Sequence, residues 1–175
     1  MRKTTAWIMG VSMMLTACAS VEPPQVNEVK EDKKTVKVQT HAPIIGGVET
    51  MYVDGMKMPF KARVDTGAET SSIDAQNIVP FERDGEKWVA FELVNRRNGE
   101  KQKFEKPVKR RTMIVRTGKE ERRYVVKLKV RMGKSLITAD FSLNDRTKFE
   151  YQVLVGRNII NGRYIVDPAI ENTLH

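Results

Sequence analysis

Val64-Asp65-Thr66-Gly67-Ala68 directly follows a short apolar segment in the first half of the chain. Val153-Leu154-Val155-Gly156-Arg157-Asn158-Ile159-Ile160, near the other end, is a hydrophobic stretch that runs into a glycine and then a predicted helical turn. Asp-Thr-Gly alone is a weak signal, because Asp and Gly are common at strand ends for turn reasons only. The presence of the second segment makes the pattern more specific than the tripeptide alone.

The rest of the chain alternates apolar and polar residues with period two. Within residues 123–132, Val126, Leu128 and Val130 fall on one face and the lysines fall on the other, as in a half-buried strand. Similar runs occur at residues 44–53, 58–64, 87–94, 112–115, 135–143 and 151–155. Short strands at this spacing predict a compact antiparallel barrel or sandwich. Only residues 71–78 and 157–160 are predicted to form short helical turns.

The two glycine-containing segments resemble the retropepsin pattern, in which a hydrophobic-hydrophobic-glycine strand threads the loop that bears the catalytic aspartate. Residues 44–168 resemble, more closely, a bacterial retropepsin-like family often labelled ATP-dependent zinc proteases and sometimes encoded beside ATP-grasp glutamate ligases. The matching segments are 61–72, 88–91, 121–126, 154–158 and 164–168. The resemblance implies an all-β, retropepsin-like acid protease barrel with one lobe per chain. One departure is Asp74, where the family often has a histidine.

The resemblance also implies a catalytic arrangement. An aspartic protease needs two carboxylates that share a proton, so that one activates water while the other polarises the scissile carbonyl. Each chain has one Asp-Thr-Gly, which implies a homodimer with Asp65 of both chains across a two-fold axis. Thr66 is expected to brace the pair, Gly67 to allow a close backbone approach, and Ala68 to contact substrate.

Two further groups of residues are expected near the site. Structural support is expected from Gly156, Arg157 and Asn158. A hairpin flap over the site is expected at residues 95–101 or 116–122. The second range is favoured for its Thr117-Gly118 turn, which makes these two residues predicted substrate contacts.

The zinc and ATP in the family label have little support in this sequence. Its histidines are His41 and His175, far from any catalytic motif, and no H-E-x-x-H occurs. Gly133-Lys134-Ser135 is similar to the end of a P-loop, but the glycine required five positions earlier is replaced by Leu128. We therefore predict that the protein uses no metal and no cofactor.

The N-terminal residues are typical of a bacterial lipoprotein. Arg2 and Lys3 precede an apolar run of about ten residues, too short for the roughly 20 that span a bilayer. Leu15-Thr16-Ala17-Cys18 resembles a lipobox, with lipid attached to Cys18, although an ordinary secretory signal is the alternative. Ala19 does not supply the aspartate associated with inner-membrane retention, so the periplasmic face of the outer membrane is the expected location.

These features divide the chain into three predicted parts. Residues 1–17 form a signal peptide, residues 18–43 a lipidated cysteine with a flexible tether, and residues 44–175 the protease domain. The tether is rich in proline and charge and has no aromatic residue, so it cannot bury enough surface to order itself. The chain has no cysteine besides Cys18, which argues against cysteine protease chemistry.

Charge and composition limit the partners. The formal net charge is +9, and basic residues gather at 96–111 and 116–134. A nucleic-acid surface requires aromatic residues among the basic ones, and the first stretch has only Phe104. We predict no nucleic-acid partner, and interpret the basic stretches as a solvated sheet face or as a surface for acidic substrates or anionic envelope polymers.

The sequence therefore predicts a membrane-anchored aspartic endopeptidase that hydrolyses peptide or protein substrates as a homodimer. One alternative is a non-catalytic envelope lipoprotein of the same fold that binds peptide or anionic polymer. Another is cleavage of glutamate-rich chains, suggested by the family's gene neighbours and the basic surface.

Overall fold

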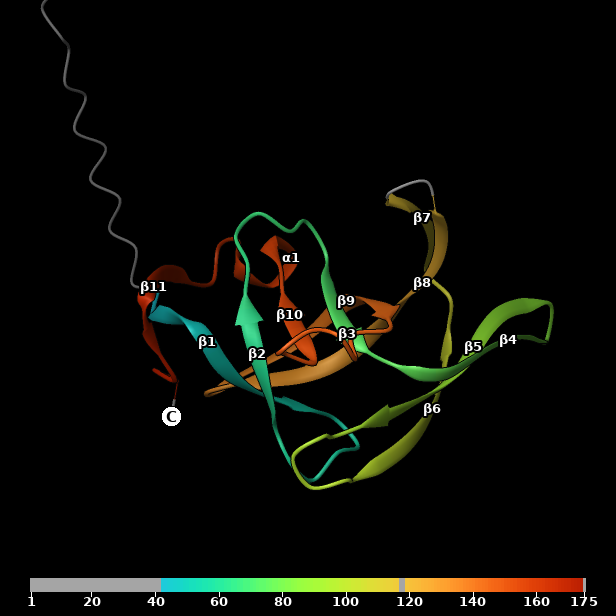
Figure 1. Ribbon diagram of the computed structural model, residues 1–175, viewed down its shortest axis with the longest axis horizontal. Coiled ribbons are helices and arrows are strands. Elements are labelled where there is room, and N and C mark those ends of the chain that lie inside the picture. The colour runs from blue at the N-terminus through green and yellow to red at the C-terminus, as the bar shows by residue number, and fades with distance from the viewer. Residues whose placement is uncertain (1–41, 117–118, 175) are drawn as a thin grey trace, which may run out of the picture. The chain divides into compact units, whose positions relative to one another are not determined.

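The computed structural model describes residues 42–116 and 119–174, which form two β-sheets and one short helix (Figure 1). The larger sheet has eight strands in the order β11-β1-β2-β10-β3-β9-β8-β7. They are β1 (Ile44–Val53), β2 (Phe60–Val64), β3 (Ser71–Asp74), β7 (Arg110–Arg116), β8 (Lys119–Met132), β9 (Ser135–Asn144), β10 (Val153–Val155) and β11 (Ile165–Glu171). The smaller sheet has the order β4-β5-β6. Its strands are β4 (Gln76–Arg83), β5 (Glu86–Val94) and β6 (Lys101–Pro107).

The larger sheet closes into a barrel. Strand β1 pairs with β2 on one side and also with β8, through Tyr52↔Arg131 and Val53↔Val130. Strands β1, β2, β10, β3, β9 and β8 thus form a closed six-stranded barrel. Large apolar side chains such as Phe60, Phe141 and Leu128 fill its interior. The all-β barrel predicted from the sequence is confirmed.

The sequence predicted an antiparallel barrel or sandwich, and most strand pairs are antiparallel, but three are parallel. These are β1 with β11, β2 with β10, and β3 with β9. The partners in each pair are far apart in the sequence, so local turn signals could not reveal their direction. The pairing of β2 with β10 matters most for the site. Because the two strands are parallel, the last residue of β2, Val64, lies beside the last residue of β10, Val155.

The alternation in residues 123–132 is confirmed in β8. Val126, Leu128 and Val130 are buried in the core, whereas Lys127 and Lys129 are exposed. The basic residues of this part of the strand therefore form a solvated outer face.

The predicted helical turn at residues 71–78 is wrong. Residues 71–74 are β3, and residues 76–78 begin β4. All four residues of β3 are buried, and the strand lies between β10 and β9. This pairing with distant strands overrides the weak local pattern. The other predicted turn is confirmed as α1 (Arg157–Ile160), the one helix in the described part of the chain.

The smaller sheet contributes to the same core. Val89, Phe91 and Leu93 of β5 are buried within the main apolar cluster, and the Phe91 ring stacks on Phe104 of β6 at 5.5 Å. Strands β4, β6 and β11 were not predicted, because most of their residues are exposed and no buried apolar face marks them in the sequence. Across residues 42–116 and 119–174, no helix has the length and apolarity needed to cross a bilayer.

Candidate active site

Asp65 begins the loop that follows β2. Its backbone N–H donates to the carbonyl of Val155 in β10 at 2.9 Å, which extends the β2–β10 pairing by one residue. Its carboxylate Oδ1 accepts hydrogen bonds from the N–H groups of Gly67 at 2.8 Å and Ala68 at 3.2 Å. These two donors orient the carboxylate, and Asp65 stays half-buried at the edge of a cavity.

The next two residues are exposed in the single chain. Thr66 and Gly67 both face solvent. A Cβ on Gly67 would lie 3.2 Å from Asp65 Oδ1, so the glycine leaves space beside the carboxylate. The expected bracing by Thr66 across a dimer axis stays a prediction, as does the close approach of Gly67 to a second chain.

The second glycine segment braces this loop from the other end of the sequence. Arg157 donates through NH1 to the carbonyls of Thr66 at 3.1 Å and Gly67 at 2.7 Å, and its backbone N–H donates to Ala68 O at 2.8 Å. A Cβ on Gly156 would lie 2.8 Å from the same Ala68 carbonyl. No side chain fits at position 156 without moving the loop.

Asn158 ties the loop to two further strands. Its Oδ1 accepts from both the N–H (2.9 Å) and the hydroxyl (2.8 Å) of Ser71, and its Nδ2 donates to the Asp140 carbonyl at 2.8 Å. The Ser71 hydroxyl accepts in turn from Gly156 N–H at 2.9 Å. The structure thus brings together the segments 65–68 and 156–158 that the sequence singled out.

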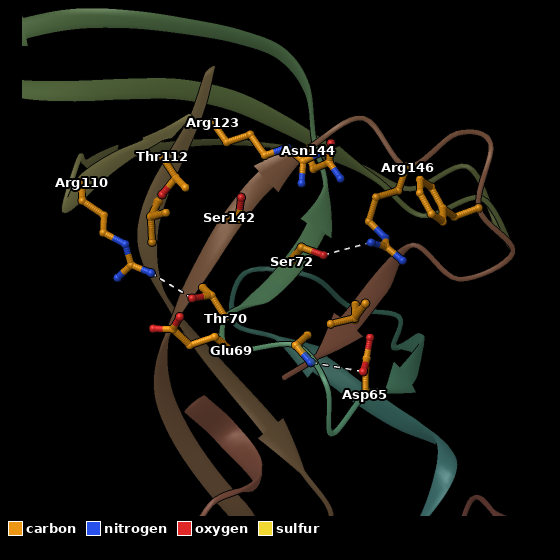
Figure 2. A pocket seen from close by; sticks show the side chains of 14 residues that line it. Asp65, Glu69, Thr70, Ser72, Arg110, Thr112, Arg123, Ser142, Asn144 and Arg146 are labelled. Carbon is orange, nitrogen blue, oxygen red and sulfur yellow. Dashed lines mark hydrogen bonds between the residues drawn. The ribbon is translucent and has the colours of Figure 1, made fainter. Parts of the chain in front are cut away.

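A cavity of about 590 Å³ lies beside Asp65 (Figure 2). In Figure 2, Asp65 lies at the lower right of the view, Arg146 at the upper right, Arg123 at the top and Arg110 at the left. The lining residues are Asp65, Ala68, Glu69, Thr70, Ser72, Arg110, Thr112, Arg123, Val125, Ser142, Asn144, Arg146, Phe149 and Leu154. Three arginines thus line a cavity that is also lined by two carboxylate residues, Asp65 and Glu69.

Comparison with known proteins assigns this arrangement to a family. The family model described as "Retropepsin-like aspartic endopeptidase RimB" matches residues 44–174. The chain belongs to the RimB-like family. The match covers the whole barrel, the Asp65 loop and the bracing segment.

Individual relatives support this assignment. A protein named "Probable alpha-L-glutamate ligase" from Shewanella pealeana is 38% identical over 130 residues, which are 72% of this chain and 28% of the relative. A protein of the same name from Parasynechococcus marenigrum is 37% identical over 129 residues, 71% of this chain and 28% of the relative. The RimB-like chain thus spans little more than a quarter of these relatives.

A solved structure shares the fold. The crystal structure of a protein of unknown function (DUF785) from Legionella pneumophila superposes with a TM-score of 0.65 at 29% sequence identity. The superposition covers 76% of this chain and 98% of that one.

The sequence did not point to the arginines of this RimB-like pocket. Arg110 precedes the predicted strand at 112–115, and Arg146 follows β9 in a loop, so neither belongs to a recognisable motif. Arg123 falls on the polar face of the predicted strand but is only 8% exposed. The available signals were the basic excess and, for Arg123, the family-like segment 121–126, and neither placed any of these groups beside Asp65.

Arg110 is held by two residues of the barrel. Its NH2 donates to the Thr70 hydroxyl at 2.9 Å, and its NH1 lies 3.4 Å from Asp140 Oδ2. Burial by itself would raise the pKa of Asp140, but hydrogen bonds and charge from Lys109 and Lys127 outweigh it and hold the pKa below its ordinary value. Asp140 therefore stays ionised and supports Arg110 at the mouth of the pocket.

The two flap candidates occupy different places. In the β7–β8 hairpin, Arg110, Thr112, Arg123 and Val125 line the cavity that contains Asp65. Thr117 and Gly118, the predicted tip contacts, lie outside the described residues. The turn at 95–101 instead borders a separate hollow of about 210 Å³, so it does not share a cavity with Asp65. A flap at the β7–β8 hairpin stays a prediction, and the position of this hairpin beside the Asp65 cavity is consistent with it.

Within the described ranges, no group of three or more His, Cys, Asp or Glu side chains is placed to hold a metal ion. Cys18, His41 and His175 lie outside the described residues, and so does the predicted signal and tether through residue 41. The absence of a cofactor stays a prediction.

Proposed function

We propose that this RimB-like chain is an aspartic endopeptidase whose catalytic dyad forms from Asp65 of two chains. The observation that carries the proposal is the construction of the Asp65 loop. Its carboxylate is oriented by two backbone donors and opens on a cavity, while Arg157 braces the loop from ninety-one residues away in the sequence. A turn that existed only to reverse the chain would not require this support.

The chemistry assigns each carboxylate a role. Two aspartates close together cannot both ionise, so the dyad holds one proton between them. The ionised partner takes a proton from water, which attacks the scissile carbonyl, while the protonated partner donates a hydrogen bond to the carbonyl oxygen. A single chain supplies one such group, and the exposure of Thr66 and Gly67 leaves this face accessible to a second copy.

We propose acidic, glutamate-containing chains as the substrate class. Arginine recognises carboxylates in a planar, two-pronged geometry, and three arginines line the cavity that contains Asp65. The names of the relatives, which refer to glutamate ligation, point to the same amino acid. An acidic segment would lie along Arg110, Arg123 and Arg146 while its backbone crosses the Asp65 dyad.

The decisive experiment mixes active and inactive chains. Residues 19–175 are incubated with glutamate-rich peptides from acidic to neutral pH, and products are sequenced by mass spectrometry. We expect cleavage that stops with Asp65→Asn and falls on dilution. Excess Asp65→Asn chains, allowed to exchange with wild type, should inhibit it, because each mixed dimer has one competent carboxylate.

The outcomes separate the alternatives. Binding of acidic peptide with no cleavage at any pH would favour a non-catalytic binding protein of the same fold. Full activity in the mixture, with exchange verified by mass spectrometry, would refute a dyad that needs Asp65 from both chains.

We also propose that Cys18 carries lipid and holds the domain at the periplasmic face of the outer membrane. The lipobox-like Leu15-Thr16-Ala17-Cys18 supports this proposal. Metabolic labelling with a palmitate analogue tests it, and label of equal strength in Cys18→Ala protein would refute it.

A further inference from the structure

Asp74 is a buried carboxylate that does not line the cavity. It ends β3 and is 2% exposed. Its Oδ1 accepts a hydrogen bond from the backbone N–H of Arg146 at 2.8 Å, and its Oδ2 accepts from Gln152 Nε2 at 3.3 Å. Its own N–H donates to the Gln152 carbonyl at 2.7 Å. Asp74 therefore holds both ends of residues 145–152, here called the 145–152 loop.

This loop supplies part of the cavity wall. Arg146 and Phe149 both line the cavity, and the Arg146 guanidinium lies 4.6 Å from the centre of the Phe149 ring. Arg146 donates through NH1 to the Ser72 hydroxyl at 3.0 Å, as Figure 2 shows, and through Nε to the Tyr151 carbonyl at 3.1 Å. The position of the Arg146 guanidinium therefore depends on the conformation of the loop.

Arg96, which follows β5, closes the network from the other side. Its guanidinium donates to the carbonyls of Arg146 at 3.2 Å and Phe149 at 3.1 Å, and its NH2 lies 3.7 Å from Asp74 Oδ2. Its backbone N–H donates to Gln152 Oε1 at 2.8 Å. The Asp74 charge and the Arg96 charge thus meet behind the loop, out of contact with the cavity.

Burial makes this arrangement selective for one loop conformation. A buried carboxylate is costly unless it is paired and hydrogen-bonded. In this chain the partners of Asp74 are the two ends of the loop and Arg96, so the cost is offset only when the loop is closed around it. Another loop conformation would deprive the charge of the Arg146 N–H and Gln152 Nε2 donors.

We infer that Asp74 is a positioning residue that sets the place of the Arg146 guanidinium in the cavity and thereby the affinity for acidic side chains. This inference rests on the proposed function, because it assigns Arg146 to substrate carboxylates. Asp74 touches neither substrate nor Asp65, so its removal acts on binding and leaves the chemical step intact.

The test compares two buried carboxylates. Asp74→Asn keeps the shape but removes the charge, whereas Glu49→Gln makes the same kind of change at a 0% exposed carboxylate that holds the C-terminal residues and does not line the cavity. For a glutamate-rich peptide, we expect Asp74→Asn to raise KM by roughly tenfold, as for a small misplacement of a binding group, with kcat within about twofold. Asp74→Asn should also reduce the preference of the protein for this peptide over the same peptide with glutamine in place of glutamate. Glu49→Gln should change neither KM nor preference.

A binding measurement keeps this test separate from catalysis. Calorimetric titration of the same peptides into Asp65→Asn and Asp65→Asn/Asp74→Asn proteins should show the same roughly tenfold loss, even if the wild type cleaves nothing and the proposed protease activity fails. Arg96→Gln, at a side chain 37% exposed, is a second variant that should weaken binding in the same direction if Asp74→Asn does not fold. Wild-type affinity in both variants would overturn the inference, as would an equal loss in Glu49→Gln.

Discussion

Two loops beside the cavity are built alike and present opposite charges. In the 65–68 loop, Asp65 Oδ1 accepts from the N–H two residues later, and in the 145–152 loop Asp145 Oδ1 does the same with Thr147 at 2.9 Å. Each loop also receives an arginine from a distant segment, which donates to its backbone carbonyls: Arg157 in the first and Arg96 in the second.

The difference lies in which side chain turns to the cavity. In the 65–68 loop, Asp65 lines the cavity. In the 145–152 loop, Arg146 lines the cavity and Asp145 does not. The local hydrogen-bond pattern is therefore insufficient to define a catalytic aspartate, because Asp145 has it too. Remote packing decides whether a loop of this construction offers a carboxylate or a guanidinium.

The largest expected effect comes from exchanging the two aspartates for asparagine. Asp65→Asn should lower kcat by about 10² to 10⁴-fold, since a neutral amide cannot act as a base. Asp145→Asn should leave activity unchanged, because Asp145 does not line the cavity. Steady-state kinetics on a cleavable peptide, with circular dichroism to confirm the fold, checks both. Similar losses in the two variants would break the comparison between the loops.

Removing the two bracing arginines should separate their roles. Arg157→Ala removes the donors to the Thr66 and Gly67 carbonyls and should lower kcat by on the order of tenfold or more, because the Asp65 loop is then less well fixed. Arg96→Ala should instead raise KM, because it loosens the loop that carries Arg146. Michaelis curves for both variants on one substrate make the test, and a fall in kcat as large for Arg96→Ala as for Arg157→Ala would contradict it.

Gly156→Ala tests how closely the bracing segment approaches the Asp65 loop. The new Cβ would lie 2.8 Å from Ala68 O, which predicts a loss of about 1–3 kcal/mol in the free energy of unfolding. Gly99→Ala is a useful control, because no atom lies within 4 Å of the added Cβ and only the positive φ of 74° opposes it, at about 1 kcal/mol. Urea denaturation measures both. Only Gly156→Ala should also lower activity.

The last expected effect is on stability and leaves activity unchanged, and it concerns Glu49, a carboxylate that does not line the cavity. Burial by itself would raise the pKa of Glu49, but hydrogen bonds from Gly46, Thr173 and Leu174 outweigh it, so the pKa lies below its ordinary value of 4.5. Ionised Glu49 therefore contributes stability above the ordinary pKa, and this contribution is lost as pH falls through the lowered value.

Glu49→Gln should accordingly cost about 1–3 kcal/mol in the free energy of unfolding at neutral pH. The difference from wild type should shrink below pH 4.5, where wild type also loses the charge. Denaturation curves at a series of pH values measure this difference. A constant difference across the whole range would show that the ionisation of Glu49 contributes nothing.

The sequence alone determined the all-β class and, through the family resemblance, the barrel, the Asp65 loop and its bracing segment. The short-range signals behind these predictions are period-two alternation in strands such as β8, an Asp-Thr-Gly after an apolar strand, and a glycine at the end of a second one. Gly156 and Arg157 could be named in advance because the family resemblance supplied their place. Residues 71–78 could not be predicted in this way, because their conformation depends on β9 and β10.

Only the tertiary structure decided which charged residues share a cavity with Asp65. Arg110 and Arg123 lie on the two strands of the β7–β8 hairpin and Arg146 follows β9, and their neighbours in sequence give no sign that the three share a cavity. The role of Asp74 was equally hidden, because a lone aspartate after Ser72-Ile73 becomes significant only when Arg146 and Gln152 fold against it. Strand patterns depend on residues a few positions apart, whereas a binding site depends on side chains that only folding brings together.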